Sequence, residues 1–184
     1  MLLMTIRGTP FLFAGDEIGS EQVPIPFDRV RDPFETLVKG FDLGRDPERA
    51  PLRWDGTEGG GFTTGEPWLP LGPDRARNIK AQQRDQQSLL NLYRELIALR
   101  RREPCLLQGE YHPRRAQNDI FSFERTLDEM EILVGLNISG EPRLWEWQGY
   151  GLKLLSTGLD RGPRKVEGPV HLKPNEGVII KVTR

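Results

Sequence analysis

The stretch from Gly44 to Asp55 concentrates side chains that could bind a hydroxylated ligand. Pro47 and Pro51 predict a loop with a defined path, because proline fixes φ and removes a backbone donor. The loop carries three arginines, three acids and an indole: Arg45, Arg49, Arg53, Asp46, Glu48, Asp55 and Trp54. Guanidinium groups and carboxylates hydrogen-bond hydroxyls, and an indole can stack on a ring face. The same composition also suits a surface loop with local ion pairs.

A second pair of carboxylates, Asp16 and Glu17, follows the apolar run from Pro10 to Ala14. A short apolar run without alternation is typical of a strand covered on both faces, as in a parallel sheet. In a (β/α)8 barrel, which is a closed parallel sheet, the active site lies at the carboxyl ends of the strands. Acids in a tight turn also anchor the turn through hydrogen bonds, and that is the role we expect here.

The remaining candidate groups are isolated. His112 and His171 stand far apart with no triad or metal-ligand context, so we expect surface or packing roles. The single Cys105 excludes an internal disulfide framework and fits a reducing, cytoplasmic location. No Asp-rich calcium loop and no cofactor motif is present, so the sequence predicts no metal and no cofactor.

Charge and hydropathy exclude two classes of partner. The formal net charge is −1, from 26 basic and 27 acidic residues, which gives no electrostatic case for nucleic acid or an anionic membrane. The apolar N-terminal residues are interrupted by Arg7 and Gly8, so they are too short to span a bilayer and lack the order of a signal peptide. We expect the chain to begin inside a buried element, with a helix tail closed by Gly8.

Two kinds of element must position these groups. An apolar stripe at helical spacing predicts a helix that begins at Asp85 as N-cap, carries Arg100 to Arg102 in its last turn and ends at Pro104. A long ordered loop is expected between about Gly15 and Arg84.

Beyond Leu106 the pattern changes to short strands between turns. The predicted strands are Ile120 to Arg125, Glu131 to Ile138, Leu152 to Leu155 and Gly177 to Val182. The sequence therefore predicts an α/β part over residues 1–104 and an all-β part, an antiparallel sandwich, over residues 105–184.

Several motifs carry a family resemblance. Gly44 to Asp55 resembles the Gly-Arg-Asp-Pro-x-Arg-x-Pro-x-x-Trp-Asp signature of α-glucosidases in glycoside hydrolase family 13, the α-amylase superfamily. Upstream, Gly8 to Gly19 resembles the last barrel strand of that family, and Pro67-Trp-Leu-Pro70 recurs near its pocket. The resemblance implies that residues 1–104 are the terminal piece of a (β/α)8 barrel, with its last helix, followed by the C-terminal β-domain.

The resemblance also implies site roles. Arg45 would reach the glucose in the terminal subsite, which favours substrates with a free non-reducing end, and Asp46 and Arg49 are secondary candidates that would brace the loop. Ala50 and Leu52-Arg53 depart from the usual Thr and Met-Gln, which leaves substrate preference open.

The catalytic carboxylates of the family follow the fourth, fifth and seventh barrel strands and map onto nothing here. We therefore expect a C-terminal fragment that is inactive alone. Its expected partners are the missing barrel portion and, through the complete enzyme, an oligosaccharide or α-glucoside.

An alternative is a non-catalytic carbohydrate-binding or structural β-module that uses Trp145, Trp147 and Tyr150 as a platform, although core packing is the role we expect for these aromatics. A third alternative is an unrelated small enzyme, but the sequence contains no set of catalytic side chains that would support it. Linkage specificity, and hydrolysis against transfer or isomerisation, stay open at this point.

Overall fold

The computed structural model describes residues 1–38, 41, 43–160 and 162–183. The chain divides into two compact units, one formed by Met1–Phe11 with Leu92–Arg184 and the other by Leu12–Asn91. The first contains every strand found in the described residues, and the second contains the loop that the sequence singled out.

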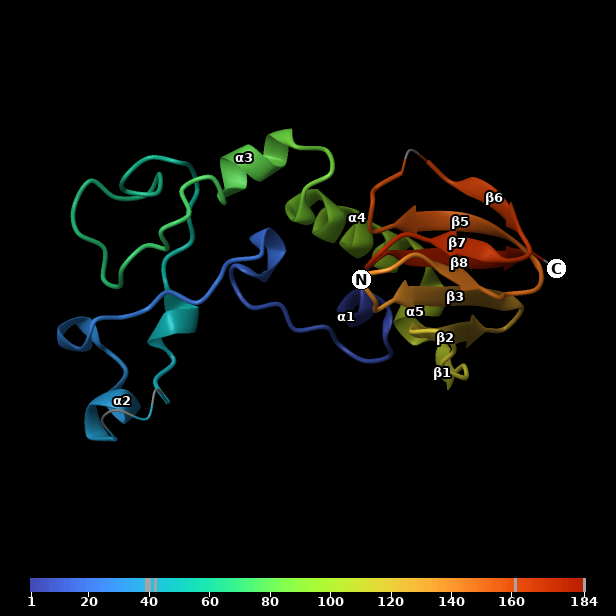
Figure 1. Ribbon diagram of the computed structural model, residues 1–184, viewed down its shortest axis with the longest axis horizontal. Helices are drawn as coiled ribbons and strands as arrows, with labels where there is room; N and C mark the ends of the chain where they lie inside the picture. Colours follow the sequence, from blue (N-terminus) through green and yellow to red (C-terminus); the bar gives the residue numbers. More distant parts are fainter. Residues whose placement is uncertain (39–40, 42, 161, 184) are drawn as a thin grey trace. The chain divides into compact units, whose positions relative to one another are not determined.

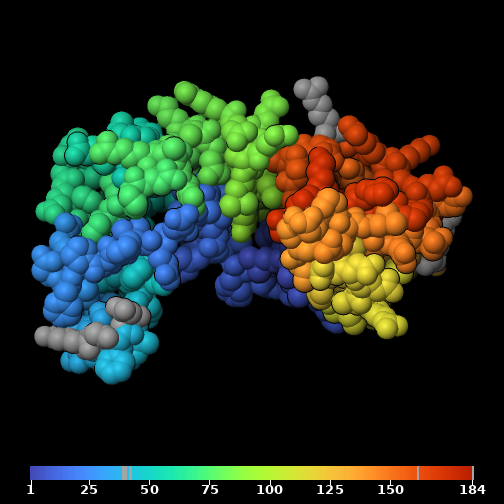
Figure 2. All heavy atoms as spheres, viewed as in Figure 1, coloured from blue at the N-terminus to red at the C-terminus, as the bar shows by residue number. Residues whose placement is uncertain are grey.

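The first unit is built on a six-stranded sheet with the order β1-β2-β3-β8-β5-β6 (Figure 1). Every pairing in it is antiparallel, as the sequence predicted. Its strands are β1 (Glu110–Pro113), β2 (Ile120–Leu127), β3 (Met130–Asn137), β5 (Tyr150–Ser156), β6 (Arg164–Glu167) and β8 (Gly177–Thr183). A separate antiparallel pair is formed by β4 (Arg143–Trp145) and β7 (Val170–Leu172). In the space-filling view the residues of these strands, yellow to red, gather into one continuous body (Figure 2).

Both faces of the large sheet are covered, which explains why β3 reads as a continuous apolar run. Ile132 and Val134 face a cluster that contains Leu96, Leu99 and Leu106 of the helices. Leu133 between them faces the opposite cluster. That second cluster joins the large sheet to the small one through Trp145, Trp147 and Leu172. Successive strand residues therefore meet different partners, and all can be apolar.

The four longer strands were predicted, and the four short ones were not. β1, β4, β6 and β7 have only three or four residues each; the side chains of β1 and β6 are mostly exposed, and β4 and β7 bury one side chain each. Because segments this short hold at most two full alternations, no period of two marks them in the sequence.

The main helix, α4 (Leu89–Arg102), carries the predicted apolar stripe and the three arginines of its last turn. Its predicted start at Asp85 is wrong, because Asp85 ends the preceding helix α3 (Ile79–Arg84). Ser88 takes the capping role, since its Oγ accepts from the Asn91 N–H at 3.2 Å. Pro104 does more than end α4: it opens the short helix α5 (Pro104–Gln108) at a position where its missing N–H has no cost.

The predicted strand from Pro10 to Ala14 is not a strand in the structure. In the described parts of the chain no strand pairs with it, and the side chain of Phe11 is 85% exposed. A lone strand has neither hydrogen-bond partners nor neighbouring side chains, so the apolar run forms no ladder. The helix before it, α1 (Leu2–Thr5), also ends earlier than the predicted closure at Gly8.

Two buried arginines hold the N-terminal residues onto the first unit. Arg125 on β2 is fully buried and donates to the carbonyl oxygens of Thr5 at 2.7 Å, Leu106 at 3.0 Å and Gly109 at 2.7 Å. Arg100 on α4 donates to the carbonyls of Met4 at 2.8 Å, Ile6 at 3.2 Å and Gly8 at 2.6 Å. Backbone carbonyls thus solvate both guanidinium groups in place of water.

The second unit is largely irregular, as the sequence predicted for residues 15–84. Besides α3, its short helical elements are η1 (Asp16–Ile18), η2 (Phe27–Arg29), α2 (Pro33–Leu37) and η3 (Asp46–Arg49). Within the irregular stretch from Glu21 to Gly40, Lys39 and Gly40 lie outside the described residues. A small apolar cluster of Ile18, Ile79 and Leu90, with Leu52 against it, anchors the loops.

Candidate functional site

The site is built around Asp32, a residue that the sequence did not single out. Asp32 is 1% exposed and is the N-cap of α2, where its Oδ1 accepts from the Phe34 N–H at 2.9 Å. Its Oδ2 accepts twice from Arg45, from the backbone N–H at 3.1 Å and from Nε at 2.9 Å. One buried carboxylate therefore joins the start of α2 to the first arginine of the signature loop.

Asp46 braces the same junction from the other side. Its side chain is 2% exposed, and its Oδ2 accepts from the backbone N–H groups of Arg31 at 2.5 Å and Asp32 at 2.8 Å. Within the described residues its Oδ1 has no hydrogen-bond partner. In this arrangement Asp46 contacts backbone and not solvent, in line with a bracing role.

Arg45 and Arg49 lie on the solvent side of Asp32. The Arg45 side chain is 65% exposed although its Nε is held. Nη1 of Arg49 lies 3.8 Å from the same Asp32 oxygen, which makes an ion pair too long for a hydrogen bond. The structure thus brings the three predicted residues together around Asp32, the two arginines at its carboxylate and Asp46 at its backbone N–H.

The hydrogen bonds from Arg45 and from the Phe34 N–H hold the pKa of Asp32 well below its usual value of 3.8. Asp32 is therefore charged throughout the neutral range, and Arg45 keeps an anionic partner there.

A third carboxylate completes the junction. Oε2 of Glu35 accepts from the Gly44 N–H at 2.8 Å. A Cβ added at position 44 would lie 2.8 Å from the Glu35 Cβ, so the signature glycine is needed for this close approach. A hollow of about 580 Å³ lies beside the junction and is lined by Val23, Phe27 and Val30, among others. This size is typical of small-molecule pockets, which run to about 300–1,000 Å³.

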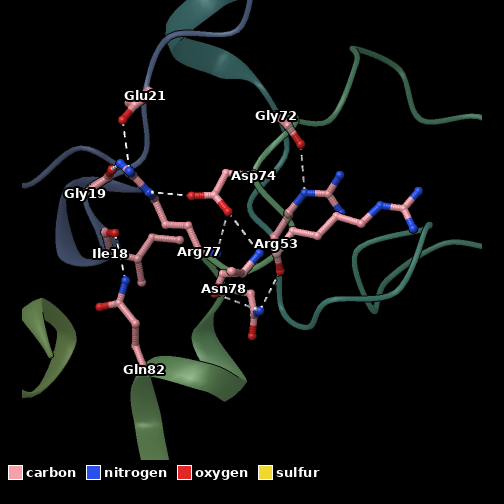
Figure 3. Close-up of polar contacts among 11 residues, drawn as sticks. Ile18, Gly19, Glu21, Arg53, Gly72, Asp74, Arg77, Asn78 and Gln82 are labelled. Atoms are coloured by element: carbon pink, nitrogen blue, oxygen red, sulfur yellow. Dashed lines mark hydrogen bonds and ion pairs between the residues drawn. The ribbon is translucent and has the colours of Figure 1, made fainter. Parts of the chain in front are cut away.

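A second polar cluster fixes the far end of the signature loop (Figure 3). Arg53 is buried and donates from Nε to the Gly72 carbonyl at 2.9 Å and from Nη1 to the Thr57 carbonyl at 3.1 Å. Arg77 donates to the Gly19 carbonyl and pairs with Glu21 at 2.9 Å and with Asp74 at 3.3 Å. Arg53, one of the departures from the family pattern, thus serves as an internal brace.

A hollow of about 370 Å³ adjoins this second cluster and is lined by side chains that include Phe13, Leu52 and Pro73. The polar side chains around it make contacts within the protein: Oε1 of Glu48 accepts from Gln22 at 2.7 Å, and Oδ2 of Asp16 accepts from the Phe13 N–H at 2.9 Å.

Several other candidates have structural roles. Asp16 and Glu17 anchor their own turn, as expected, and Oε2 of Glu17 accepts from the Gly15 N–H at 2.8 Å. Trp145 and Trp147 are 7% and 4% exposed and belong to the core cluster between the sheets, so the carbohydrate platform that would use them is not formed. Only Tyr150 of that set is exposed.

In the described parts of the chain, no group of three or more His, Cys, Asp or Glu side chains is placed to hold a metal ion. The same residues contain no helix of the length and apolarity needed to cross a membrane.

We expect the junction to loosen in acid. Because the folded-state pKa of Asp32 lies below its unfolded value of 3.8, the folded state binds fewer protons, and this contribution to stability is complete above about pH 4. It is lost as the pH falls through the folded-state pKa. Hydrogen exchange of the Arg45 and Phe34 amides, measured at pH 5, 4 and 3, should accelerate beyond the intrinsic rate. In Arg45→Met the acceleration should begin at higher pH; an identical onset would contradict this account.

The sequence contained one signal for Asp32. Asp followed by Pro marks the start of a helix, with the acid as N-cap and proline in the first turn. That signal locates α2 but not the contact with Arg45, which lies 13 residues further along.

Comparison with known proteins agrees with the motifs. The family model for the α-amylase catalytic domain matches residues 1–109. Oligo-1,6-glucosidase of Parageobacillus thermoglucosidasius is 28% identical over 204 residues, which is 98% of this chain and 36% of that enzyme. Oligo-1,6-glucosidase of Halalkalibacterium halodurans is 34% identical over 160 residues, 76% of this chain and 28% of that enzyme.

Solved structures are similar over almost the whole chain. Trehalulose synthase MutB from Pseudomonas mesoacidophila superposes with a TM-score of 0.83 at 29% identity, covering 99% of this chain and 37% of MutB. A MutB variant solved in complex with glucose gives a TM-score of 0.85. The chain spans about a third of the length of these relatives. The catalytic-domain model matches more than half of this chain. The chain therefore belongs to the α-amylase family of glycoside hydrolases.

Proposed function

We propose that this chain forms the C-terminal part of an α-glucosidase-type glycoside hydrolase that acts on α-glucosides and on malto- or isomalto-oligosaccharides. Residues 1–104 would complete a (β/α)8 barrel, with Pro10 to Ala14 as its last strand, and residues 105–184 would form the β-sandwich that follows. The match of the catalytic-domain model to residues 1–109 supports a boundary near this point. The two oligo-1,6-glucosidase relatives support the substrate class.

The observation that carries the proposal is the presentation of Arg45. Its guanidinium is exposed and is fixed by a buried carboxylate. The residues on either side of it in the chain, Gly44 and Asp46, line a hollow of small-molecule size. A guanidinium held in this way can donate to the hydroxyls of a terminal glucose residue. A hydrogen bond from a charged donor contributes about 1.5–3 kcal/mol, enough to decide which sugar end is accepted.

The catalytic carboxylates would come from the rest of the barrel. Retaining hydrolysis needs a nucleophile and a general acid about 5–5.5 Å apart, both facing the scissile bond. The acids of the second unit described above accept hydrogen bonds within their own loops and have structural roles. We therefore expect this chain alone to be inactive.

Exposed apolar side chains are evidence that another polypeptide covers this part of the chain. Phe11, Phe13 and Leu37 are 85%, 56% and 82% exposed, far more than isolated apolar residues on a stable surface require. The remaining part of a family barrel would supply both a strand for Pro10 to Ala14 and cover for these side chains.

The test is complementation. The chain is co-expressed with the portion of the P. thermoglucosidasius oligo-1,6-glucosidase that it does not match, and hydrolysis of isomaltose and of a nitrophenyl α-glucoside is measured. We expect neither piece to be active alone and the copurified pair to be active. Hydrolysis by the purified 184-residue chain alone would overturn the proposal.

In the active pair, Arg45→Ala should lower kcat/KM for isomaltose by about 10- to 150-fold, the equivalent of one hydrogen bond from a charged donor. Arg75→Ala is the matched control, because Arg75 is also an exposed loop arginine but lies outside the Asp32 junction, and it should leave kcat/KM unchanged. Equal effects of the two changes would remove Arg45 from the binding site.

A further inference from the structure

The contact between Asp32 and Arg45 has an unusual asymmetry of exposure. The Asp32 side chain is 0% exposed, whereas the Arg45 side chain is 65% exposed. The carboxylate is therefore fixed inside the protein while the guanidinium it binds faces solvent. A ligand can reach Arg45 but not the acid behind it.

The hydrogen bonds to Asp32 use only one edge of the guanidinium. Asp32 Oδ2 accepts from the Arg45 backbone N–H and from Nε, so the main chain and the side chain of this arginine are held to one oxygen. In the part of the chain that the structure describes, the hydrogen bonds of this guanidinium involve Nε alone, and both terminal amino groups remain for another acceptor.

Asp32 is itself held by backbone groups. Its own N–H donates to Asp46 Oδ2 at 2.8 Å, and its Oδ1 accepts from the Phe34 N–H at 2.9 Å. Together these bonds leave the carboxylate little freedom to rotate. The order of contacts runs from Asp46 to Asp32 to Arg45, from two buried acids to an exposed arginine.

We propose that Asp32 is a positioning residue, which fixes the Arg45 guanidinium through Nε so that its two terminal amino groups are presented together to a pair of hydroxyls on a glucosyl residue. This inference rests on the proposed function of Arg45 as a sugar donor. Asp32 does not touch the sugar. An exposed arginine without such a partner samples many rotamers, and fixing it beforehand lowers the cost of binding.

Lysine could not replace Arg45 in this arrangement. Its ammonium is a single point charge, so the group that bonded Asp32 would also have to bond the sugar. Arg49 cannot substitute either, because at 3.8 Å it contributes charge to Asp32 and no hydrogen bond.

The positioning contact is tested first on the 184-residue chain, independently of any activity. Proton exchange at Arg45 Nε is measured by nitrogen-15 NMR, with the signal assigned by its loss in Arg45→Met. In Asp32→Asn we expect this exchange to be at least about tenfold faster, as the loss of a hydrogen bond from a charged donor implies. Asp28→Asn removes an exposed acid of the same loop and should change nothing. Equal exchange in the two variants would overturn the proposal.

Loss of the buried carboxylate could also disturb the loop, so a second variant leaves Asp32 in place. Arg45→Met removes an exposed side chain, and the Asp32 carboxyl carbon is titrated by carbon-13 NMR. If Arg45 holds the carboxylate, the pKa of Asp32 should rise toward its ordinary value in this variant. A pKa that stays unchanged would contradict the contact.

Kinetics of the complemented pair then separate the inference from the proposed function. Asp32→Asn should raise KM for isomaltose several-fold more than it lowers kcat, because the acid orients a binding group. If Arg45→Ala lowers kcat/KM and Asp32→Asn has no effect, the positioning role is wrong and the proposed function stands. If neither has an effect, the proposed function of Arg45 fails as well.

Discussion

Replacement of Arg125 by methionine is expected to lower the free energy of unfolding of the first unit by about 3–5 kcal/mol, the cost typical of removing one partner from a buried charged contact. Arg125 is fully buried, and the carbonyls of Thr5, Leu106 and Gly109 accept from its guanidinium. Methionine fills much of the space but donates no hydrogen bond. Each carbonyl then stays buried without a partner, at about 1–3 kcal/mol apiece.

Part of this loss is offset, because folding of the methionine variant no longer removes a charged guanidinium from water. Burial already lowers the pKa of Arg125, which shows the direction of that cost. We therefore place the net effect at the size of one broken buried contact and not at the sum of three.

The measurement is hydrogen exchange of the β3 and β8 amides, which lie in the centre of the sheet and report on the opening of this unit. Arg164→Met is the control, since Arg164 is an exposed arginine on β6 and its loss should change stability by less than about 0.5 kcal/mol. A similar small change for Arg125→Met would show that the carbonyls find other donors.

The sequence predicted those elements whose formation depends on their own residues. α4 has a long apolar stripe, and β2, β3, β5 and β8 have seven or eight residues each, so local pattern and burial agree. The run from Pro10 to Ala14 has the same local pattern, yet it is not a strand. A buried strand depends on neighbours that its own sequence does not contain.

For the candidate site, too, the sequence predicted the local feature, which residues are present, but not the contacts between distant residues. The motif located Arg45, Asp46 and Arg49, and their types indicated hydrogen bonds to hydroxyls or to one another. Nothing local indicated that Asp32 would accept from Arg45, because that contact depends on the path of the chain between them. Arg125 was missed for a related reason: an arginine in an alternating strand reads as an exposed residue, and the carbonyls that solvate it come from Thr5 and from residues 106–110, which lie elsewhere in the chain.

Replacement of Gly109 by alanine should be nearly as costly, about 3 kcal/mol, the upper end of the usual range for overpacking. A Cβ at this position would lie 2.3 Å from the Cys105 carbonyl oxygen and 2.8 Å from that of Thr126. Both are backbone atoms, so relief requires α5 or β2 to move. The φ of −57° suits alanine, so the cost comes from contact and not from backbone conformation.

Gly140→Ala is the matched control, because an added Cβ there meets no atom within 4 Å. Its stability should stay within about 0.5 kcal/mol of the parent. The same urea unfolding curve, followed by the fluorescence of the buried tryptophans Trp145 and Trp147, serves both variants. Equal midpoints for Gly109→Ala and Gly140→Ala would mean that α5 can shift freely.

The two large effects should not add. Gly109 supplies one of the carbonyls that Arg125 binds, and its N–H donates to Cys105 at 3.1 Å, so any shift of this turn also moves an acceptor of the guanidinium. Residues in direct contact typically couple by about 0.5–3 kcal/mol. The double variant should therefore lose less stability than the sum of the single losses. A strictly additive result would mean that the packing of α5 and the buried arginine contribute to stability independently. The hydrogen bond from Arg125 to the Gly109 carbonyl would then add no stability of its own.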